Sequence, residues 1–458
     1  MSHPKPLPPT PERATNCGLA APSAVVSVAA PAALPAAATA PAAAPSAIAW
    51  PSAARQAAFE AWLAPLAATH GLRPESLRPA SADASFRRYL RIDRAAGGSC
   101  IVMDAPPELE DCRPFVRVQA LMAAAGLRVP QILAWDEADG FMLLSDLGAH
   151  TLIEVLDPAA PAAAQGWYLQ AVEVLIEWQK ASRPGVLPAY DEALLRRELA
   201  LFPDWYVARH RSIELDAAQQ NTLARAFDAI VAHNLAAPSV FVHRDFMPRN
   251  LMLPTREGEP LAACRTLGVE SEKVPQRGQF LPDSPPHSDA MGQEDGKKWA
   301  AAAHSQPTIP KSDRLLGVLD FQDAVYGPIT YDIASLLRDA FISWDEEFVI
   351  DITVRYWEKA RRAGLLGAAS ASGWGADFGD FYRSVEWMGL QRHLKVAGIF
   401  ARLTLRDGKP KYLADAPRFI AYIRATASRY RELAPLLRLL DQIEGVQEQS
   451  GWAFGRVS

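Results

Sequence analysis

The sequence predicts an α+β protein with two lobes, a small β-rich lobe followed by a larger, mainly helical one. Three observations lead to this prediction. Strand-like apolar runs gather in residues 86–144, long amphipathic helical patterns dominate after Gly148, and two later short strands each run directly into a polar cluster. The 458 residues, 49% of them hydrophobic, are enough for two packed lobes.

The chain begins with a segment that we expect to remain a flexible tail. Residues 1–50 consist largely of Ala and Pro, whose side chains bury too little surface to offset the entropy lost on ordering. Prolines at 22, 31, 35, 41 and 45 interrupt its apolar stretches, which argues against a secretory signal. No apolar run approaches the length of a membrane span, so we expect a cytoplasmic protein.

We expect the small lobe to comprise residues 51–147 and to bind a nucleotide. Apolar residues at helical spacing predict helices over 53–67 and 115–125. Residues rich in aromatic and β-branched side chains predict strands over 86–92, 100–103 and 141–144.

The larger lobe is expected over residues 148–446, with a short tail at 447–458. A helix over 167–180 and strands over 240–242 and 315–319 are predicted within it. Residues 255–313 lack periodicity and are rich in Pro, Gly, Ser and charge, so we interpret them as a disordered insertion in a hairpin-like connection.

Charge and cysteine content narrow the classes of partner. There are 47 Lys and Arg against 52 Asp and Glu, which gives a formal charge of -5. The chain therefore has no net positive charge that would favour binding to nucleic acid or to an anionic membrane. The four cysteines form no C-x-x-C pair, which is typical of a reducing compartment. No obligate protein partner is evident.

Two polar clusters carry the candidate chemistry. The first is His243-Arg244-Asp245-Phe246-Met247-Pro248-Arg249-Asn250, and the second is Asp320-Phe321-Gln322. Phosphoryl transfer needs a group that orients or deprotonates the attacking hydroxyl, and hard oxygen ligands for a Mg²⁺ ion that bridges the phosphates. Both needs can be met by Asp245, by Asn250 five residues later and by Asp320 at the end of the second strand.

These two clusters resemble the H-x-D-x-x-x-x-N and D-x-x motifs of kinase-fold phosphotransferases of the aminoglycoside-phosphotransferase type. The resemblance implies that Asp245 is the catalytic base, with Arg249 as a second catalytic candidate. It also implies that Asn250 and Asp320 hold Mg²⁺. Within it, His243 supports the loop and Asp332 braces the site without reacting.

Within that group, residues 53–440 without the insertion are most similar to the cell-wall-recycling N-acetylmuramate/N-acetylglucosamine 1-kinases. The similarity is carried by Asp-Phe-Met-Pro-Arg-Asn, by residues 319–328 and by residues 390–395. It implies MgATP-dependent phosphorylation of the anomeric C1 hydroxyl of an amino sugar. It also implies that residues 81–89 form a loop over the nucleotide and that residues 143–148 form a hinge between the lobes. These two segments would supply the residues that bind ATP, namely Ser85, Phe86, Arg87, Arg88, Ser145, Asp146 and Leu147.

The sequence departs from the family in lacking the usual lysine in the third strand of the small lobe. Arg87, Arg88 or Arg91 could meet the phosphates instead, because a guanidinium binds phosphate in fork geometry.

For the sugar, we select three candidate substrate residues. Arg392 and Lys395 lie three residues apart on one predicted helix and would share a face, where their positive charges could attract a substrate carboxylate. Trp205, with Trp387, could offer an aromatic surface to the ring.

Two alternatives stay open. The chain could phosphorylate another small hydroxyl substrate of the aminoglycoside, choline or homoserine type, or it could be a nucleotide-binding pseudokinase scaffold. The retention of Asp245, Asn250 and Asp320 together opposes the scaffold. A protein kinase is disfavoured, since no recognisable activation segment follows Asp320.

Overall fold

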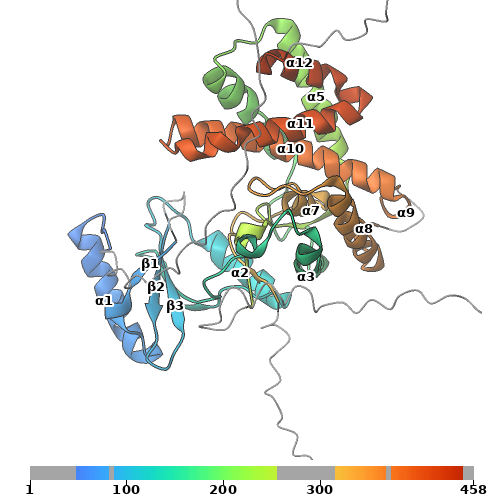
Figure 1. The fold of residues 1–458 in the computed structure, drawn as a ribbon. Helices are drawn as coiled ribbons and strands as arrows, with labels where there is room; N and C mark the ends of the chain where they lie inside the picture. Colours follow the sequence, from blue (N-terminus) through green and yellow to red (C-terminus); the bar gives the residue numbers. More distant parts are fainter. Residues whose placement is uncertain (1–47, 82–86, 255–314, 368–372, 447–458) are drawn as a thin grey trace, which may run out of the picture. The chain divides into compact units, whose positions relative to one another are not determined.

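A computed structural model describes residues 48–81, 87–254, 315–367 and 373–446 of the chain. A small sheet lobe precedes a mostly helical remainder, which confirms the predicted α+β, two-lobed fold (Figure 1). Within these residues, no helix combines the length and the apolar character that crossing a bilayer requires.

The small lobe is a five-stranded antiparallel sheet with the order β1-β2-β3-β5-β4. Helix α1 packs on one face of this sheet, where Phe59 and Leu63 join Leu90 and Val102 in a separate apolar cluster (Figure 1). Helix α2 contributes to the other apolar cluster, which also contains Met103, Met142 and Leu144 of the sheet. The elements are α1 (Ala53–His70), β1 (Arg78–Ser81), β2 (Arg88–Asp93), β3 (Ser99–Asp104), α2 (Arg113–Ala124), β4 (Ile132–Asp136) and β5 (Phe141–Ser145).

The two faces of β2 explain where its arginines point. Successive side chains of a strand alternate between faces. Arg88 therefore lies on the side of Leu90, where it shares the buried carboxylate of Asp104 with Arg55 of α1. Arg91 lies on the other side and reaches Asp146 at the end of β5, with Nε to Oδ2 at 2.6 Å.

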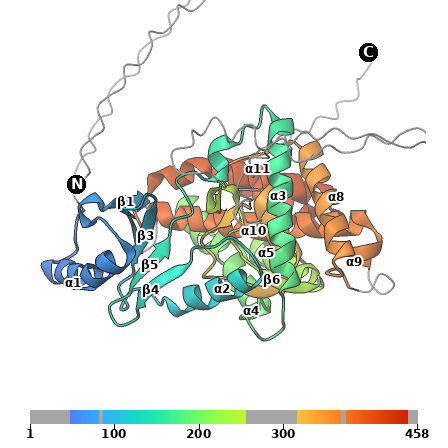
Figure 2. The ribbon, with the colours of Figure 1, turned by 90° about the horizontal axis from the view of Figure 1, so that it is seen from below.

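The helical lobe is built around α10, which contacts α5, α7, α11 and η3 (Figure 2). Gly398 lets α10 approach η3 closely, because an added Cβ would lie only 2.3 Å from the carbonyl oxygen of Leu201. The elements are α3 (Pro161–Lys180), α4 (Glu192–Leu199), the π-helix η3 (Phe202–His210), α5 (Ala217–Leu235), α7 (Thr330–Leu337), α8 (Glu346–Arg362), α9 (Gly373–Ala376), α10 (Phe378–Leu405), α11 (Ala416–Arg429) and α12 (Ala434–Glu444).

Two short strand pairs within this lobe present the polar clusters. Strand β6 (Ser239–Val242) pairs with β9 (Val325–Pro328), and β7 (Leu251–Met252) pairs antiparallel with β8 (Gly317–Val318). The segment 255–313 lies outside the described residues, but the β7 and β8 strands on either side of it form the expected hairpin-like pair.

Candidate active site

The two strand pairs bring the polar clusters together. The first cluster leaves β6 at His243, forms the 3₁₀ turn η4 (Pro248–Asn250) and continues as β7. Because β7 pairs with β8, Asp320 lies beside this turn, and the backbone N–H of Leu319 donates to the carbonyl of Asn250 at 2.9 Å. The Nδ2 atom of Asn250 lies 3.3 Å from Oδ2 of Asp320 and 2.9 Å from the carbonyl oxygen of Asp245.

His243 braces the loop from inside the protein. Its Nε2 atom donates to the carbonyl of Leu319 at 3.0 Å, and its Nδ1 atom accepts the backbone N–H of Asp245 at 3.2 Å. Both contacts require the neutral imidazole with its proton on Nε2. Burial lowers the pKa of His243 to about 4, which agrees with this structural role.

Asp332, at the start of α7, holds the same loop from the other side. Its carboxylate accepts the backbone N–H groups of His243 at 2.7 Å and Arg244 at 3.0 Å. Complete burial raises its pKa to about 7, although both hydrogen bonds and the charge of Arg392 favour the ionised form. The backbone at Arg244 has φ 77° and that at Asp320 has φ 64°, so both clusters contain a non-glycine residue in the left-handed region.

A buried ion cluster supports Arg244. The carboxylate of Glu198 on α4 accepts Nη2 of Arg244 at 2.5 Å and Nζ of Lys395 at 2.8 Å. It also accepts the hydroxyl of Tyr190 at 2.5 Å. The nearby cations keep the pKa of Glu198 low despite its burial. The cluster thus fixes the residue that precedes Asp245.

The predicted substrate residues occupy three different environments. Arg392 is 6% exposed, donates to the carbonyl of Arg244 at 2.7 Å and stacks over Tyr331. Lys395 is held by Glu198. Trp205 lies on η3 with the guanidinium of Arg209 3.9 Å from its ring centroid. Trp387 is 3% exposed in the helical core, so it offers no surface to a sugar ring, contrary to the sequence expectation.

Arg249 differs from these residues because its side chain is exposed. Its guanidinium lies 4.6 Å from the centroid of the Phe341 ring. Asp245, three residues before Pro248 in the same loop, is partly exposed, and its backbone N–H and carbonyl are held by His243 and Asn250.

The predicted nucleotide-binding residues have partners within the small lobe. Arg87 pairs with Glu110 at 3.1 Å, and Arg88 pairs with Asp104 on the α1 face. At the hinge, Ser145 Oγ accepts the N–H of Gln131 at 2.8 Å, and the carbonyl of Leu147 accepts Nη2 of Arg128 at 2.7 Å. Asp146 binds Arg91 and Ser99. Ser85 and Phe86 lie outside the described residues.

A divalent cation fits the donor set at the junction of the two clusters. Asp320 offers a carboxylate, Asn250 offers an amide oxygen, and both lie at the same edge of the β7–β8 pair. Among the described residues, no three His, Cys, Asp or Glu side chains gather as a closed metal site. Mg²⁺ suits such an open pair, since it keeps waters and phosphate oxygens as its remaining ligands.

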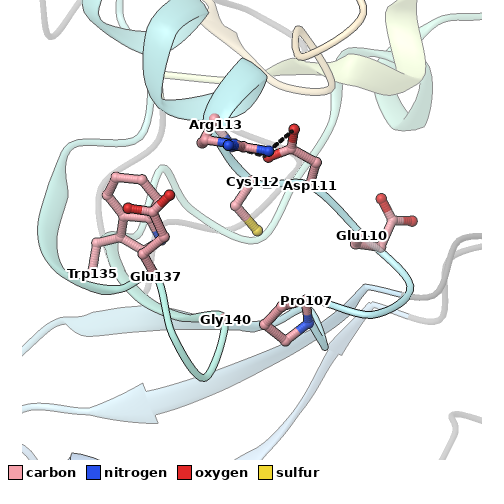
Figure 3. Close-up of a pocket in the computed structure, with 8 residues that line it drawn as sticks. All are labelled: Pro107, Glu110, Asp111, Cys112, Arg113, Trp135, Glu137 and Gly140. Carbon is pink, nitrogen blue, oxygen red and sulfur yellow. Dashed lines mark hydrogen bonds and ion pairs between the residues drawn. The ribbon is translucent and has the colours of Figure 1, made fainter.

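A separate pocket of about 260 Å³ lies in the small lobe (Figure 3). Figure 3 shows Asp111 paired with Arg113 beside the thiol of Cys112, and Trp135 and Glu137 across the opening. None of its lining residues belongs to either polar cluster. One lining residue, Glu110, pairs with Arg87 of the predicted nucleotide-binding set.

Sequence reasoning missed Glu198 as the centre of the ion cluster. The available signal was a glutamate three residues after Leu195 and next to Leu199, two leucines at i, i+4 spacing that are fully buried. A charged residue on the apolar face of a helix usually has a buried partner. Nothing in the sequence identified Arg244 and Lys395 as those partners.

Known proteins are similar in sequence to this chain over most of its length. The chain is 46% identical over 367 residues to the N-acetylmuramate/N-acetylglucosamine kinase of Pseudomonas aeruginosa, with 80% of this chain and 88% of that protein covered. It is 43% identical over 377 residues to the protein of the same name from Neisseria meningitidis, with 82% and 93% covered. Among solved structures, macrolide 2'-phosphotransferase MphH from Brachybacterium faecium matches at 14% identity and TM-score 0.43, with 79% of this chain and 98% of that chain covered.

The sequence pattern of the Phosphotransferase enzyme family (APH) matches residues 76–264 and 309–365. These ranges include both polar clusters, all five strands of the small sheet and the hinge. Since the matched ranges make up more than half of the chain and the relatives align over most of it, the chain belongs to the Phosphotransferase enzyme family.

Proposed function

We propose that this protein is an ATP-dependent kinase that phosphorylates the anomeric C1 hydroxyl of N-acetylmuramate, N-acetylglucosamine or both, in peptidoglycan recycling. The observation that carries the proposal is that Asn250 contacts both the backbone carbonyl of Asp245 and the carboxylate of Asp320 beside the β7–β8 pair, in a chain 46% identical to an N-acetylmuramate/N-acetylglucosamine kinase. A phosphotransferase needs these three oxygen donors together, whereas a scaffold does not.

In this proposal, Asp245 orients the sugar hydroxyl and accepts its proton as the oxygen attacks phosphorus. The loop is suited to that role because His243 and Asn250 fix the backbone N–H and carbonyl of Asp245, which leaves its carboxylate for the substrate. Arg249 in the same loop is a further catalytic candidate. Asn250 and Asp320 would hold Mg²⁺, which neutralises charge on the phosphates when bound.

The small lobe is the proposed site of ATP binding, through the loop that includes Ser85 to Arg88 and the hinge from Ser145 to Leu147. Trp205, Arg392 and Lys395 remain proposed substrate-side residues; the last two would act mainly by fixing the loop, given their internal partners. We also propose a cytoplasmic location, which suits the unpaired buried thiols of Cys100 and Cys112.

The test is ATP consumption by the purified protein with Mg²⁺ and one of four acceptors: N-acetylmuramate, N-acetylglucosamine, kanamycin or choline. We expect turnover with an amino sugar and a product phosphorylated at C1. Asp245→Asn should lower kcat by about 10²- to 10⁴-fold while ATP still binds. Asp228→Asn is the matched control, because Asp228 is an exposed carboxylate paired with Arg196 on the protein surface.

The other results separate the alternatives. Turnover with only kanamycin or choline would support kinase activity but contradict an amino sugar as the substrate. ATP binding without turnover of any acceptor would favour the pseudokinase scaffold.

A further inference from the structure

We infer that the guanidinium of Arg249 binds the lactyl carboxylate of N-acetylmuramate and makes this acid a better substrate than N-acetylglucosamine. The inference rests on the proposed function. The two sugars differ only in a lactyl ether on O3, which carries a carboxylate. A protein that prefers the acid must therefore present an unengaged cation to that group.

The other cations around Asp245 are engaged inside the protein. Arg244 and Lys395 share the buried carboxylate of Glu198, at 2.5 Å and 2.8 Å. Arg392 donates to the carbonyl of Arg244 and is 6% exposed. Turning any of them toward a substrate would leave a buried partner without its hydrogen bond, which is costly.

Arg249 has the opposite character. Its side chain is exposed, and within the described ranges it forms no ion pair with a carboxylate. The buried Asp339 acts on it electrostatically, but Oδ1 of that carboxylate accepts the N–H of Ala340 instead. A guanidinium over a ring, as this one is at 4.6 Å from the Phe341 centroid, can still donate its N–H groups to a carboxylate in fork geometry.

The direction of Arg249 separates it from the proposed metal site. In the 3₁₀ turn η4, successive side chains diverge by about 120° because the turn has three residues per revolution. Asn250 points to Asp320, with Nδ2 to Oδ2 at 3.3 Å. Arg249 points to Phe341, whose ring lies 6.3 Å from that of Phe400 on α10. Arg249 thus faces the helical lobe, where the acceptor would bind, and Asn250 faces the phosphates.

The experiment compares kcat/KM for N-acetylmuramate, its methyl ester and N-acetylglucosamine in the full-length protein. In Arg249→Gln, the ratio of kcat/KM for N-acetylmuramate to that for N-acetylglucosamine should fall by about 10- to 100-fold, the usual size of a charged hydrogen bond. Arg249→Lys should lose less, since it keeps the charge without the fork. The ratio for the neutral methyl ester should change little in either variant.

Arg361→Gln is the matched control, because Arg361 is also an exposed arginine stacked on a ring, 4.7 Å from Trp357 on α8. Its ratio should equal that of the wild type. An equal fall for both sugars in Arg249→Gln would overturn the inference and assign Arg249 to the shared phosphate. A wild type that prefers N-acetylglucosamine would also overturn it while keeping the kinase. A wild type that phosphorylates neither sugar would instead contradict the proposed function.

Discussion

The side chain of Asp332 fixes the backbone of Arg244, whose N–H it accepts at 3.0 Å. Arg244 has φ 77°, a conformation that costs a non-glycine residue about 1–2 kcal/mol. The same carboxylate accepts the N–H of His243 at 2.7 Å, so α7 holds two consecutive residues immediately before Asp245. The loop therefore owes its shape to a residue that need not touch the substrate.

Replacing Asp332 by asparagine should lower both the stability of the protein and its turnover rate. An amide has only one acceptor oxygen, so one of the two N–H groups would face an NH₂ group instead. We expect the free energy of unfolding to fall by about 1–3 kcal/mol, and kcat to fall more than ATP affinity. Urea denaturation and calorimetric titration with ATP measure the two effects. A folded variant with wild-type kcat would show that the loop holds its shape without Asp332.

Protonation of His243 should destabilise the protein in acid. Its pKa is about 4 in the folded state and 6.5 in the unfolded chain, so the unfolded chain binds the proton first as the pH falls. The stability contributed by neutral His243 is complete above pH 6.5 and declines toward pH 4, by a total of about 3 kcal/mol.

The test is the pH dependence of unfolding in the wild type and in His243→Gln, which keeps an amide donor for Leu319 but cannot titrate. The difference in stability between the two proteins should shrink as the pH falls from 6.5 to 4. A difference that stays constant over this range would refute the assignment. Asp332 and Asp339 titrate in both proteins, so their contribution cancels in the comparison.

Glu198→Gln should be strongly destabilising. It leaves Arg244 and Lys395 as buried cations without a counter-charge, which costs about 3–5 kcal/mol. Glu177→Gln is the control, since its pair with Lys180 is exposed and contributes about 0–1 kcal/mol. Chemical denaturation of both variants decides the point, and equal losses would mean that the buried cluster adds no more than a surface pair.

How far the sequence predicts this site depends on the kind of contact. Asp245 and Asp320 could be selected because each comes soon after an apolar strand, and Asn250 because it lies five residues after Asp245 in the same motif. The pairing of β7 with β8 then brings Asn250 and Asp320 together. Spacing also put Arg392 and Lys395 on one helix face, but it could not reveal what that face meets. Their partners are Arg244 and Glu198, which come from distant parts of the chain.

Two strands of the small sheet, β1 and β4, were not predicted from the sequence for a different physical reason. Strand β1 is Arg-Pro-Ala-Ser and offers no apolar alternation. The residues of β4 are all partly buried, so they show no contrast between two faces. Both are edge strands, which pair on one side only. The central strands β3 and β5 were recognisable because both sides of the sheet bury them.

Removing the segment 255–313 should leave turnover nearly intact. Leu251 pairs with Val318 and Met252 pairs with Gly317, so a short Gly/Ser turn can join the two strands directly. Shortening a loop about tenfold changes its closure entropy by only about 2 kcal/mol, in the stabilising direction. Steady-state kinetics and thermal unfolding of the deletion variant test this, and loss of folding or of most turnover would give the segment a function.

Gly398→Ala should separate α10 from the chain segment that leads into η3. Its Cβ would lie 2.3 Å from the carbonyl oxygen and 2.4 Å from the carbonyl carbon of Leu201, and backbone atoms cannot rotate away. We expect a loss of about 1–3 kcal/mol in the free energy of unfolding.

Gly389→Ala, on the same helix, is the control, since its nearest neighbour would be Cδ of Arg338 at 3.5 Å, an ordinary contact. That variant should be neutral or up to about 1 kcal/mol more stable, because alanine favours a helix over glycine. Equal stabilities of the two variants would show that η3 can move away from α10 without cost in free energy.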